Sequence, residues 1–198
     1  LNLALGVLLA LGSGVGAIIL AEMLDAGLAT AEDVERRLET SYLGAVPLLA
    51  SVSEGSSVSP INYVVEKPLS SFSEAFRNLR ASILYSRLGQ PVKVVAVTSA
   101  LPGEGKTTTS LCLARSSALQ GLRTVIVDCD LRRRTVNRML DAEPASGLIE
   151  VLGGEISLDE ALIFDASSGA SFLPLAKTAF TPKEVFGTVA MDKLLADL

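Results

Sequence analysis

The most extended apolar pattern of the chain is at its beginning. Residues 1–21 are almost continuously apolar and uncharged, and only Asn2 and Ser13 are polar. At about 1.5 Å per residue, 21 helical residues reach about 30 Å, the thickness of the hydrocarbon core of a bilayer. The pattern therefore predicts a transmembrane helix within the segment 1–24, and membrane helices tolerate the glycines that it contains. A buried helix of a soluble domain is the alternative.

A polar stretch follows this apolar segment. Thr30 and the acids behind it predict a short helix over about 31–39, and an extended segment is predicted for 42–49. Residues 50–60 are rich in serine, as linkers are. We therefore expect residues 25–62 to be a juxtamembrane segment with a linker, and residues 63–198 to form a soluble domain.

The pattern of the soluble domain alternates between helix and strand. Ser71 and Glu74 have capping-box spacing and predict a helix to about Arg87. Two runs rich in β-branched residues, 92–98 and 124–128, predict buried parallel strands on either side of a helix over about 106–120. This order predicts an α/β fold of the P-loop NTPase type, with a parallel sheet flanked by helices. Further helices are predicted at 146–154, 157–163 and 183–198, and a further strand at 171–176.

The loop between the first two predicted strands fits a phosphate-binding pattern, Ala100-Leu-Pro-Gly-Glu-Gly-Lys-Thr107, with alanine at the first glycine position. Glycines let the backbone turn its amides inward, and these amides attract phosphate together with the N-terminus of the next helix. A simple helix-capping turn would not explain the lysine. We therefore expect ATP and Mg²⁺ as cofactors, with the nucleotide bound by Pro102, Gly103, Glu104, Gly105, Lys106, Thr107 and Thr108.

Two acids follow the second predicted strand, Asp128 and Asp130. They leave the carboxyl edge of the sheet, where ligands bind in such folds. A carboxylate there can hold Mg²⁺ or accept a proton from an attacking hydroxyl, although strand-end acids also cap turns. We expect Lys106, Asp128 and Asp130 to be catalytic, and Thr107 to share the metal with both acids.

Composition excludes several other chemistries. The chain has no histidine and no CxxC pair, which leaves no basis for a histidine triad or a structural zinc site. The net charge is −5, and the segment 22–67 accounts for it with eight acidic and three basic side chains. Because no basic face stands out, we expect no nucleic-acid partner.

These motifs resemble those of one family, the bacterial tyrosine kinases fused to polysaccharide co-polymerases, also called chain-length determinant proteins. LPGEGKTTTS at 101–110 matches the Walker A form of that family, and VIVDCDLR at 125–132 matches its second acidic motif, Walker A′. Glu74, Arg77 and Arg80 match the E-x-x-R-x-x-R helix through which family members assemble into a ring. The partition and cell-division ATPases differ, because they carry a signature lysine where this chain has Pro102 and Gly103.

The resemblance implies a membrane-anchored, ATP-dependent protein tyrosine kinase that regulates the polymerisation and export of exopolysaccharide or capsule. Its kinase domain would lie on the cytoplasmic side of the inner (cell) membrane, and its partners would be membrane lipid and the export and polymerisation proteins. A homo-oligomeric ring would form through the 74–80 helix. A nucleotide-binding assembly subunit without kinase activity is the alternative.

The chain departs from the family at its end and in its basic positions. A Walker B motif and a tyrosine cluster would have to follow residue 198, so we expect this chain alone to bind nucleotide poorly and not to sustain catalysis. Glu74, Arg77 and Arg80 could instead form intrahelical pairs. Four arginines after Asp130 could be a solvated face, or could touch phosphates or the acidic tail of a neighbouring subunit: Arg132, Arg133, Arg134 and Arg138.

Overall fold

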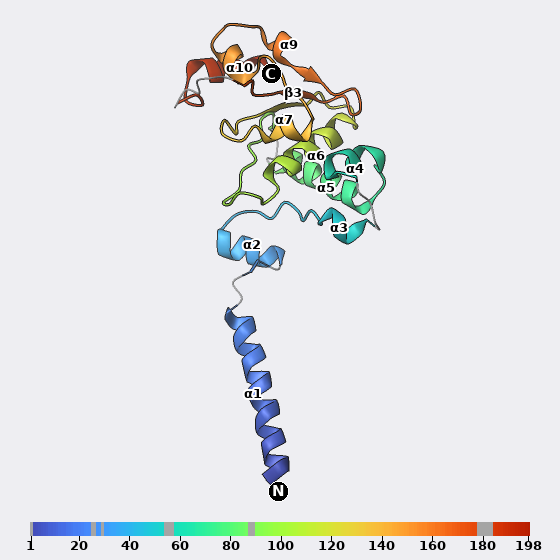
Figure 1. The fold of residues 1–198 in the computed structure, drawn as a ribbon, viewed down its shortest axis with the longest axis vertical. Coiled ribbons are helices and arrows are strands. Elements are labelled where there is room, and N and C mark those ends of the chain that lie inside the picture. The colour runs from blue at the N-terminus through green and yellow to red at the C-terminus, as the bar shows by residue number, and fades with distance from the viewer. Residues whose placement is uncertain (1, 25–26, 29, 54–57, 87–89, 178–183) are drawn as a thin grey trace. The chain divides into compact units, whose positions relative to one another are not determined.

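The computed structural model describes residues 2–24, 27–28, 30–53, 58–86, 90–177 and 184–198 (Figure 1). The chain forms two compact units, Leu1–Tyr42 and Leu43–Leu198. The first unit contains helices α1 and α2, and the second contains all the described strands.

Helix α1, Asn2–Leu24, is long and apolar enough to cross a membrane by its length and composition. Helix α2, Ala31–Leu38, begins where the sequence predicts, because the Thr30 hydroxyl accepts a hydrogen bond from the Asp33 amide at 3.1 Å. The Asp33 carboxylate in turn pairs with Arg36 at 3.1 Å. The helix predicted over about 31–39 is therefore confirmed.

The second unit begins with helices α3, Leu49–Val52, α4, Pro60–Glu66, and α5, Ser71–Tyr85. Helix α5 starts one residue earlier than its capping-box spacing suggests, since the Ser70 hydroxyl caps the Ser73 amide at 3.2 Å. Residues 54–57 of the predicted linker lie outside the described residues.

The described strands form one small sheet in the order β1-β3-β2. Strand β1, Val125–Val127, runs parallel to β3, Ser171–Leu173, whereas β2, Ile163–Phe164, runs antiparallel to β3. Helix α9, Leu158–Ala161, ends just before β2 and is shorter than its predicted range. The predicted strands at 124–128 and 171–176 are confirmed, and Pro174 follows the last residue of β3.

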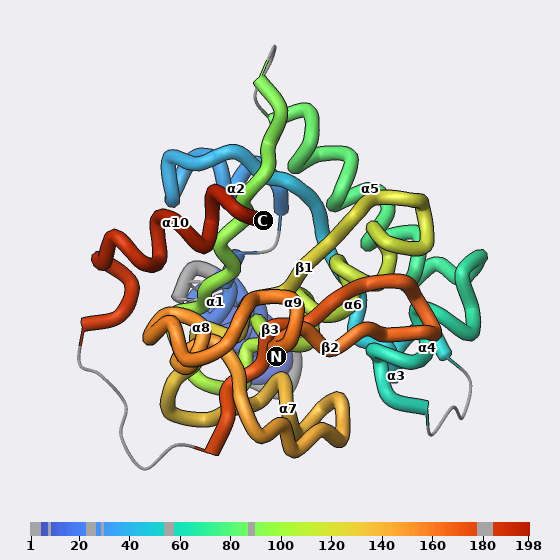
Figure 2. Tube along the Cα trace, turned by 90° about the horizontal axis from the view of Figure 1, so that it is seen from above, coloured from blue at the N-terminus to red at the C-terminus, as the bar shows by residue number. Residues whose placement is uncertain are grey.

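Helices cover both faces of this sheet, and adjacent residues of β3 show it. Phe172 is buried in a core with α4, α5, α6 (Lys106–Ala118) and α7 (Thr135–Met139). Leu173 is buried in a second core with α8 (Leu148–Leu152), α9 and α10 (Val189–Asp197). Successive side chains of a strand point to opposite faces, so β3 separates the two helical layers, as Figure 2 shows. The predicted α/β fold with flanking helices is confirmed.

The prediction of a buried strand at 92–98 is wrong. This segment is neither strand nor helix, and Val94, Val95 and Val97 are 60%, 46% and 37% exposed. A run of β-branched residues shows that a segment fits a pleated surface, but a strand also needs a hydrogen-bonding partner. Strand β1 is at the edge of the described sheet, and its free edge is not paired with this segment.

The last predicted helix begins later than its sequence range. Helix α10 starts at Val189, after Thr188, whose hydroxyl accepts a hydrogen bond from the Met191 amide at 3.3 Å. Gly187 comes directly before this cap, and glycine disfavours the helix interior by about 1 kcal/mol relative to alanine. Residue 183, the predicted start, lies outside the described residues.

Candidate functional site: a glycine loop and a strand-end carboxylate

The glycine loop leads directly into helix α6. Gly103 and Gly105 have φ values of +88° and +83°, which L side chains rarely adopt, so glycine is required at both positions. Gly105 is the residue before α6 and offers no side chain to cap the first amides of the helix. A cap of this kind leaves helix N-terminal amides available for an anion, as phosphate binding requires.

Side-chain hydrogen bonds within the loop also stabilise its conformation. The Glu104 carboxylate accepts a hydrogen bond from the Leu101 amide at 2.9 Å, and the Ser99 hydroxyl donates to the Leu101 carbonyl at 3.0 Å. The sequence predicts Glu104 as a nucleotide contact only and gives no signal for Ser99. Pro102 is exposed in this loop.

The first turn of α6 carries the side chains that the loop motif predicts. Lys106, Thr107 and Thr108 are half-buried, and the Lys106 carbonyl accepts a hydrogen bond from the Ser110 hydroxyl at 2.9 Å. Helix α6 packs against α4, α5 and β1, which fixes the direction of this turn.

Asp128 follows β1 and is only 4% exposed. Its amide donates to the Leu173 carbonyl at 3.0 Å, which extends the parallel ladder by one residue, and its Oδ1 accepts from the Asp130 amide at 3.0 Å. Its Oδ2 has no hydrogen-bond partner among the described residues. Burial, together with the nearby charge of Asp130, raises the pKa of Asp128, although the backbone amides of Asp130 and Val136 oppose this rise. An unpartnered buried carboxylate oxygen is a natural ligand for a divalent cation.

The connection between α6 and β1 brings the loop and the carboxylate to the same end. Helix α6 ends at Ala118, and the chain turns through residues 119–124 and returns along β1. Asp128 therefore leaves β1 toward the end at which Lys106 begins α6. The described residues contain no group of three or more acidic, cysteine or histidine side chains that could hold a metal. A cation here would need phosphate, hydroxyl or water oxygens beside the carboxylates, which is the usual pattern for Mg²⁺.

Arg115, on the buried face of α6, is a structural residue that the sequence patterns do not predict. Its Nε lies 2.9 Å from Asp165 Oδ2, and its Nη1 donates to the Ile61 carbonyl at 2.7 Å and to Asn62 Oδ1 at 2.9 Å. Burial opposes ionisation of Asp165, but the hydroxyls of Ser167 and Ser168 and the guanidinium of Arg115 outweigh it and lower its pKa. The one sequence signal for this contact is the position of Arg115 itself, a basic residue on a helix face whose other members are mostly apolar or small.

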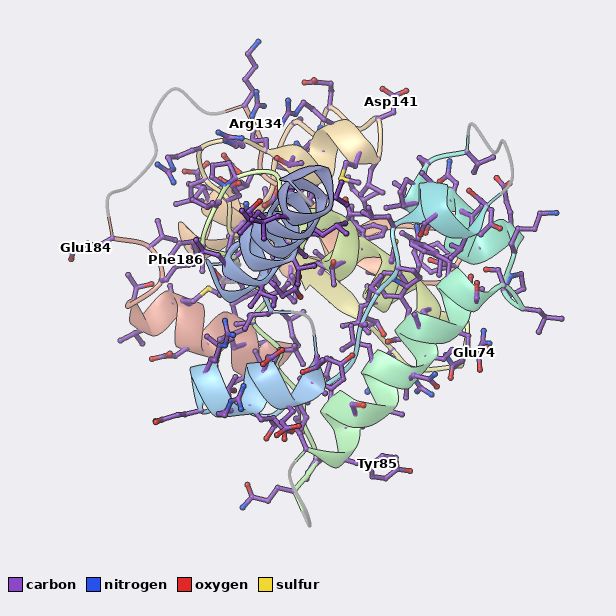
Figure 3. The ribbon with its side chains drawn as sticks, turned by 90° about the horizontal axis from the view of Figure 1, so that it is seen from below. Glu74, Tyr85, Arg134, Asp141, Glu184 and Phe186 are labelled. Carbon is purple, nitrogen blue, oxygen red and sulfur yellow. The ribbon has the colours of Figure 1, made fainter. Side chains whose placement is uncertain are left out.

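The three residues of the predicted assembly helix lie on α5 but do not pair with one another. Glu74 is exposed, and Figure 3 shows it on the outer side of α5. Arg77 donates to the Pro68 carbonyl, and Arg80 donates to Gln120 Oε1. Ion pairing of these three side chains with one another, the alternative prediction, is therefore not found among the described residues.

Comparison with known proteins shows what the chain is similar to. No family model matches the chain. The chain is 36% identical over 142 residues to the tyrosine-protein kinase YwqD of Bacillus subtilis, covering 72% of this chain and 60% of YwqD. It is 35% identical over 111 residues to the succinoglycan biosynthesis transport protein ExoP of Rhizobium meliloti, covering 56% of this chain and 14% of ExoP. The chain thus spans less than two thirds of the length of either curated relative.

A solved structure has the same fold. The kinase domain of the Escherichia coli tyrosine kinase ETK matches 86% of this chain and 69% of its own length, with a TM-score of 0.74 and 24% identity. The sequence likeness and this shared fold agree with the loop and carboxylate described above. The chain is thus similar in sequence to bacterial tyrosine kinases and has the fold of a bacterial tyrosine kinase domain.

Proposed function

We propose that this chain is part of a membrane-anchored, ATP-dependent protein tyrosine kinase that regulates the polymerisation and export of exopolysaccharide or capsule. One observation carries the proposal. Gly105 leaves the first amides of α6 without a side-chain cap, and Asp128, directly after the strand β1 that packs against α6, has a buried carboxylate oxygen without a hydrogen-bond partner among the described residues. The names of YwqD, a tyrosine-protein kinase, and ExoP, a succinoglycan transport protein, supply the reaction and the setting.

In this proposal, the residues of the site divide the work of phosphoryl transfer. Bound Mg·ATP would supply the γ-phosphoryl group and a cation that neutralises its charge. The loop amides would hold the phosphates, and the Lys106 ammonium would stabilise charge that develops during transfer. The Thr107 hydroxyl and the Asp128 carboxylate would hold the cation directly or through water, while Asp130 would accept the proton of the attacking tyrosine hydroxyl.

The proposal extends to the location and the partners of the protein. Helix α1 would anchor it in the lipid of the inner (cell) membrane, and the second unit would lie in the cytoplasm, where ATP is available. The 74–80 segment would form a homo-oligomeric ring that contacts the polysaccharide export and polymerisation proteins. Exposure of Glu74 supports this role, as does a hollow of about 290 Å³ lined in part by Arg77, which leaves room for side chains of a neighbour.

Calorimetric titration of the complete protein in neutral detergent with ADP, with and without Mg²⁺, tests nucleotide binding. Lys106→Met should weaken binding by at least about tenfold, because it removes a charge-assisted contact to phosphate. Asp128→Asn should remove the dependence on Mg²⁺. Lys193→Met, which changes an exposed lysine on α10, is the matched control and should bind as the parent does.

Phosphotyrosine formation by the complete protein separates the kinase from the alternative. The parent should become phosphorylated with ATP and its Lys106→Met variant should not. Mg²⁺-dependent nucleotide binding without phosphotyrosine would favour an assembly subunit that is not a kinase. Absence of nucleotide binding would refute both.

A further inference from the structure

A group of four arginines lies within the ten residues that follow the strand-end carboxylate, Asp128. We call it the arginine patch, and it consists of Arg132, Arg133, Arg134 and Arg138. The amides of Arg133 and Arg134 both donate to the Asp130 carbonyl, at 3.2 and 3.3 Å. The patch is therefore tied by its backbone to the second acid of the site.

The positive charge of this patch is not balanced within the described residues. Ion pairs there join Arg36 and Arg37 to Asp33, and Arg115 to Asp165, and none involves the arginine patch. Three of its four side chains are exposed, and the guanidinium of Arg138 donates to the Thr135 hydroxyl at 3.2 Å. The contrast with Arg115, which is buried and paired, shows that these charges are directed outward.

Contacts of α7 hold the backbone that carries the arginine patch in place. Val136 is buried, and the amide group of Asn137 pairs with the backbone of Leu175, donating to its carbonyl at 2.6 Å and accepting from its amide at 3.4 Å. The backbone of Arg134 has a φ of +45°. A residue other than glycine adopts such a value only where its surroundings impose it. A prearranged patch loses less entropy when it binds a ligand than a mobile basic tail does.

The chemistry of the patch selects anions with paired oxygens. Guanidinium groups bind carboxylate and phosphate through two parallel hydrogen bonds. The patch begins two residues after Asp130, at the edge where the phosphoryl group would be transferred, and Asp141 bounds it beyond the far end of α7 (Figure 3). The phosphates of the nucleotide already have the loop amides and Lys106 as partners. What remains to be held at this edge is the acceptor.

We propose that the arginine patch docks an acidic peptide segment that carries the acceptor tyrosine. The role of the bound peptide as phosphoryl acceptor rests on the proposed kinase function. Binding of the peptide itself does not require phosphoryl transfer. Carboxylates on either side of the tyrosine would pair with the guanidinium groups and place the hydroxyl near Asp130.

The test uses the full chain in neutral detergent with Mg·ADP and two fluorescein-labelled peptides, in which a central tyrosine is flanked by six glutamates or by six glutamines. Fluorescence anisotropy should show at least about tenfold tighter binding of the glutamate peptide, as several charge-assisted contacts predict. The triple variant Arg132→Gln/Arg133→Gln/Arg138→Gln should lose this preference. A matched control removes three exposed charges elsewhere: Lys67→Gln/Arg123→Gln/Lys193→Gln. It should keep the preference within about twofold.

Three other outcomes overturn the proposal. Equal affinity for the two peptides, or equal loss in both triple variants, would leave only general charge attraction. A loss of ADP affinity in the patch variant, with peptide binding intact, would assign the arginines to the nucleotide. Patch-dependent binding to phosphatidylserine vesicles without peptide preference would assign them to the membrane. Peptide docking that persists while nucleotide binding or phosphotyrosine formation fails would refute the proposed function and leave the docking surface standing.

Discussion

Replacement of Arg115 by methionine tests how the second unit is held together. Methionine keeps much of the length and the apolar stem of the side chain but removes its charge and its donors. The variant would leave Asp165 without its cation, and the Ile61 carbonyl and Asn62 without their donor. Because Arg115 joins α6 to both α4 and the β2–β3 turn, the effect should reach the whole unit.

The size of the effect follows from burial. The side chains of Arg115 and Asp165 are 8% and 12% exposed, so water cannot replace the lost partner. Removal of one member of a buried ion pair costs about 3–5 kcal/mol. With a urea m-value of about 2 kcal/mol/M, the midpoint of unfolding should fall by about 2 M. Arg123→Met, at an exposed position, is the matched control and should change stability by less than about 0.5 kcal/mol.

The pH dependence gives an independent check. The folded pKa of Asp165 is lowered, so its contribution to stability is present above its unfolded pKa of about 3.9 and is lost as pH falls through the folded value. Without Arg115, burial raises this pKa relative to the parent. The destabilisation of Arg115→Met should therefore be largest near neutral pH and should shrink toward pH 4, where the unpaired carboxyl takes up a proton.

Urea unfolding followed by circular dichroism, with the chain in neutral detergent, provides the assay. The double variant Arg115→Met/Asp165→Asn removes the stranded charge and should recover at least about 1.5 kcal/mol relative to Arg115→Met. Equal stability of the single and double variants, together with a pH-independent loss, would show that the cost lies in packing and would refute the ion-pair reasoning.

Three further substitutions have expected outcomes. Gly147→Ala would place a Cβ 2.2 Å from the Pro174 carbonyl oxygen, so the thermal midpoint should fall with a loss of about 2–3 kcal/mol. Asp128→Asn should raise the unfolding free energy at pH 7 by about 1 kcal/mol, because a raised folded pKa means that ionisation above the unfolded value destabilises the fold; a lower midpoint would contradict this. Glu104→Ala removes the acceptor of the Leu101 amide and should weaken ADP binding about three- to tenfold by calorimetry.

The sequence alone predicted the elements that local signals determine. Thr30 marks the start of α2, and the glycines with Lys106 mark the loop and the start of α6. The failures are elements that depend on distant partners. Residues 92–98 have strand composition but no ladder partner, and the two residues of β2 form a strand only because β3 lies beside them.

The candidate site shows the same division. Spacing alone places Gly103 and Gly105 where positive φ is needed, because the requirement is local to the backbone. The contacts of Arg115 and Asn137 span 38 to 54 positions in the chain, and nothing in the flanking residues announces them. Sequence patterns thus indicated the chemistry of the site, whereas the packing that holds it required the fold.

Three departures from ordinary folding rules fall within residues 128–138, directly after β1. Asp128 is a buried carboxyl with an unpartnered oxygen, Arg134 has a positive φ without being glycine, and the arginine patch leaves its charge unbalanced. Each of these features costs stability, and none is needed to close either core. A sequence under selection for stability alone would remove them, so we attribute their occurrence within residues 128–138 to the proposed ligands, a cation at the carboxylate and an acidic segment at the arginines, which would offset the cost.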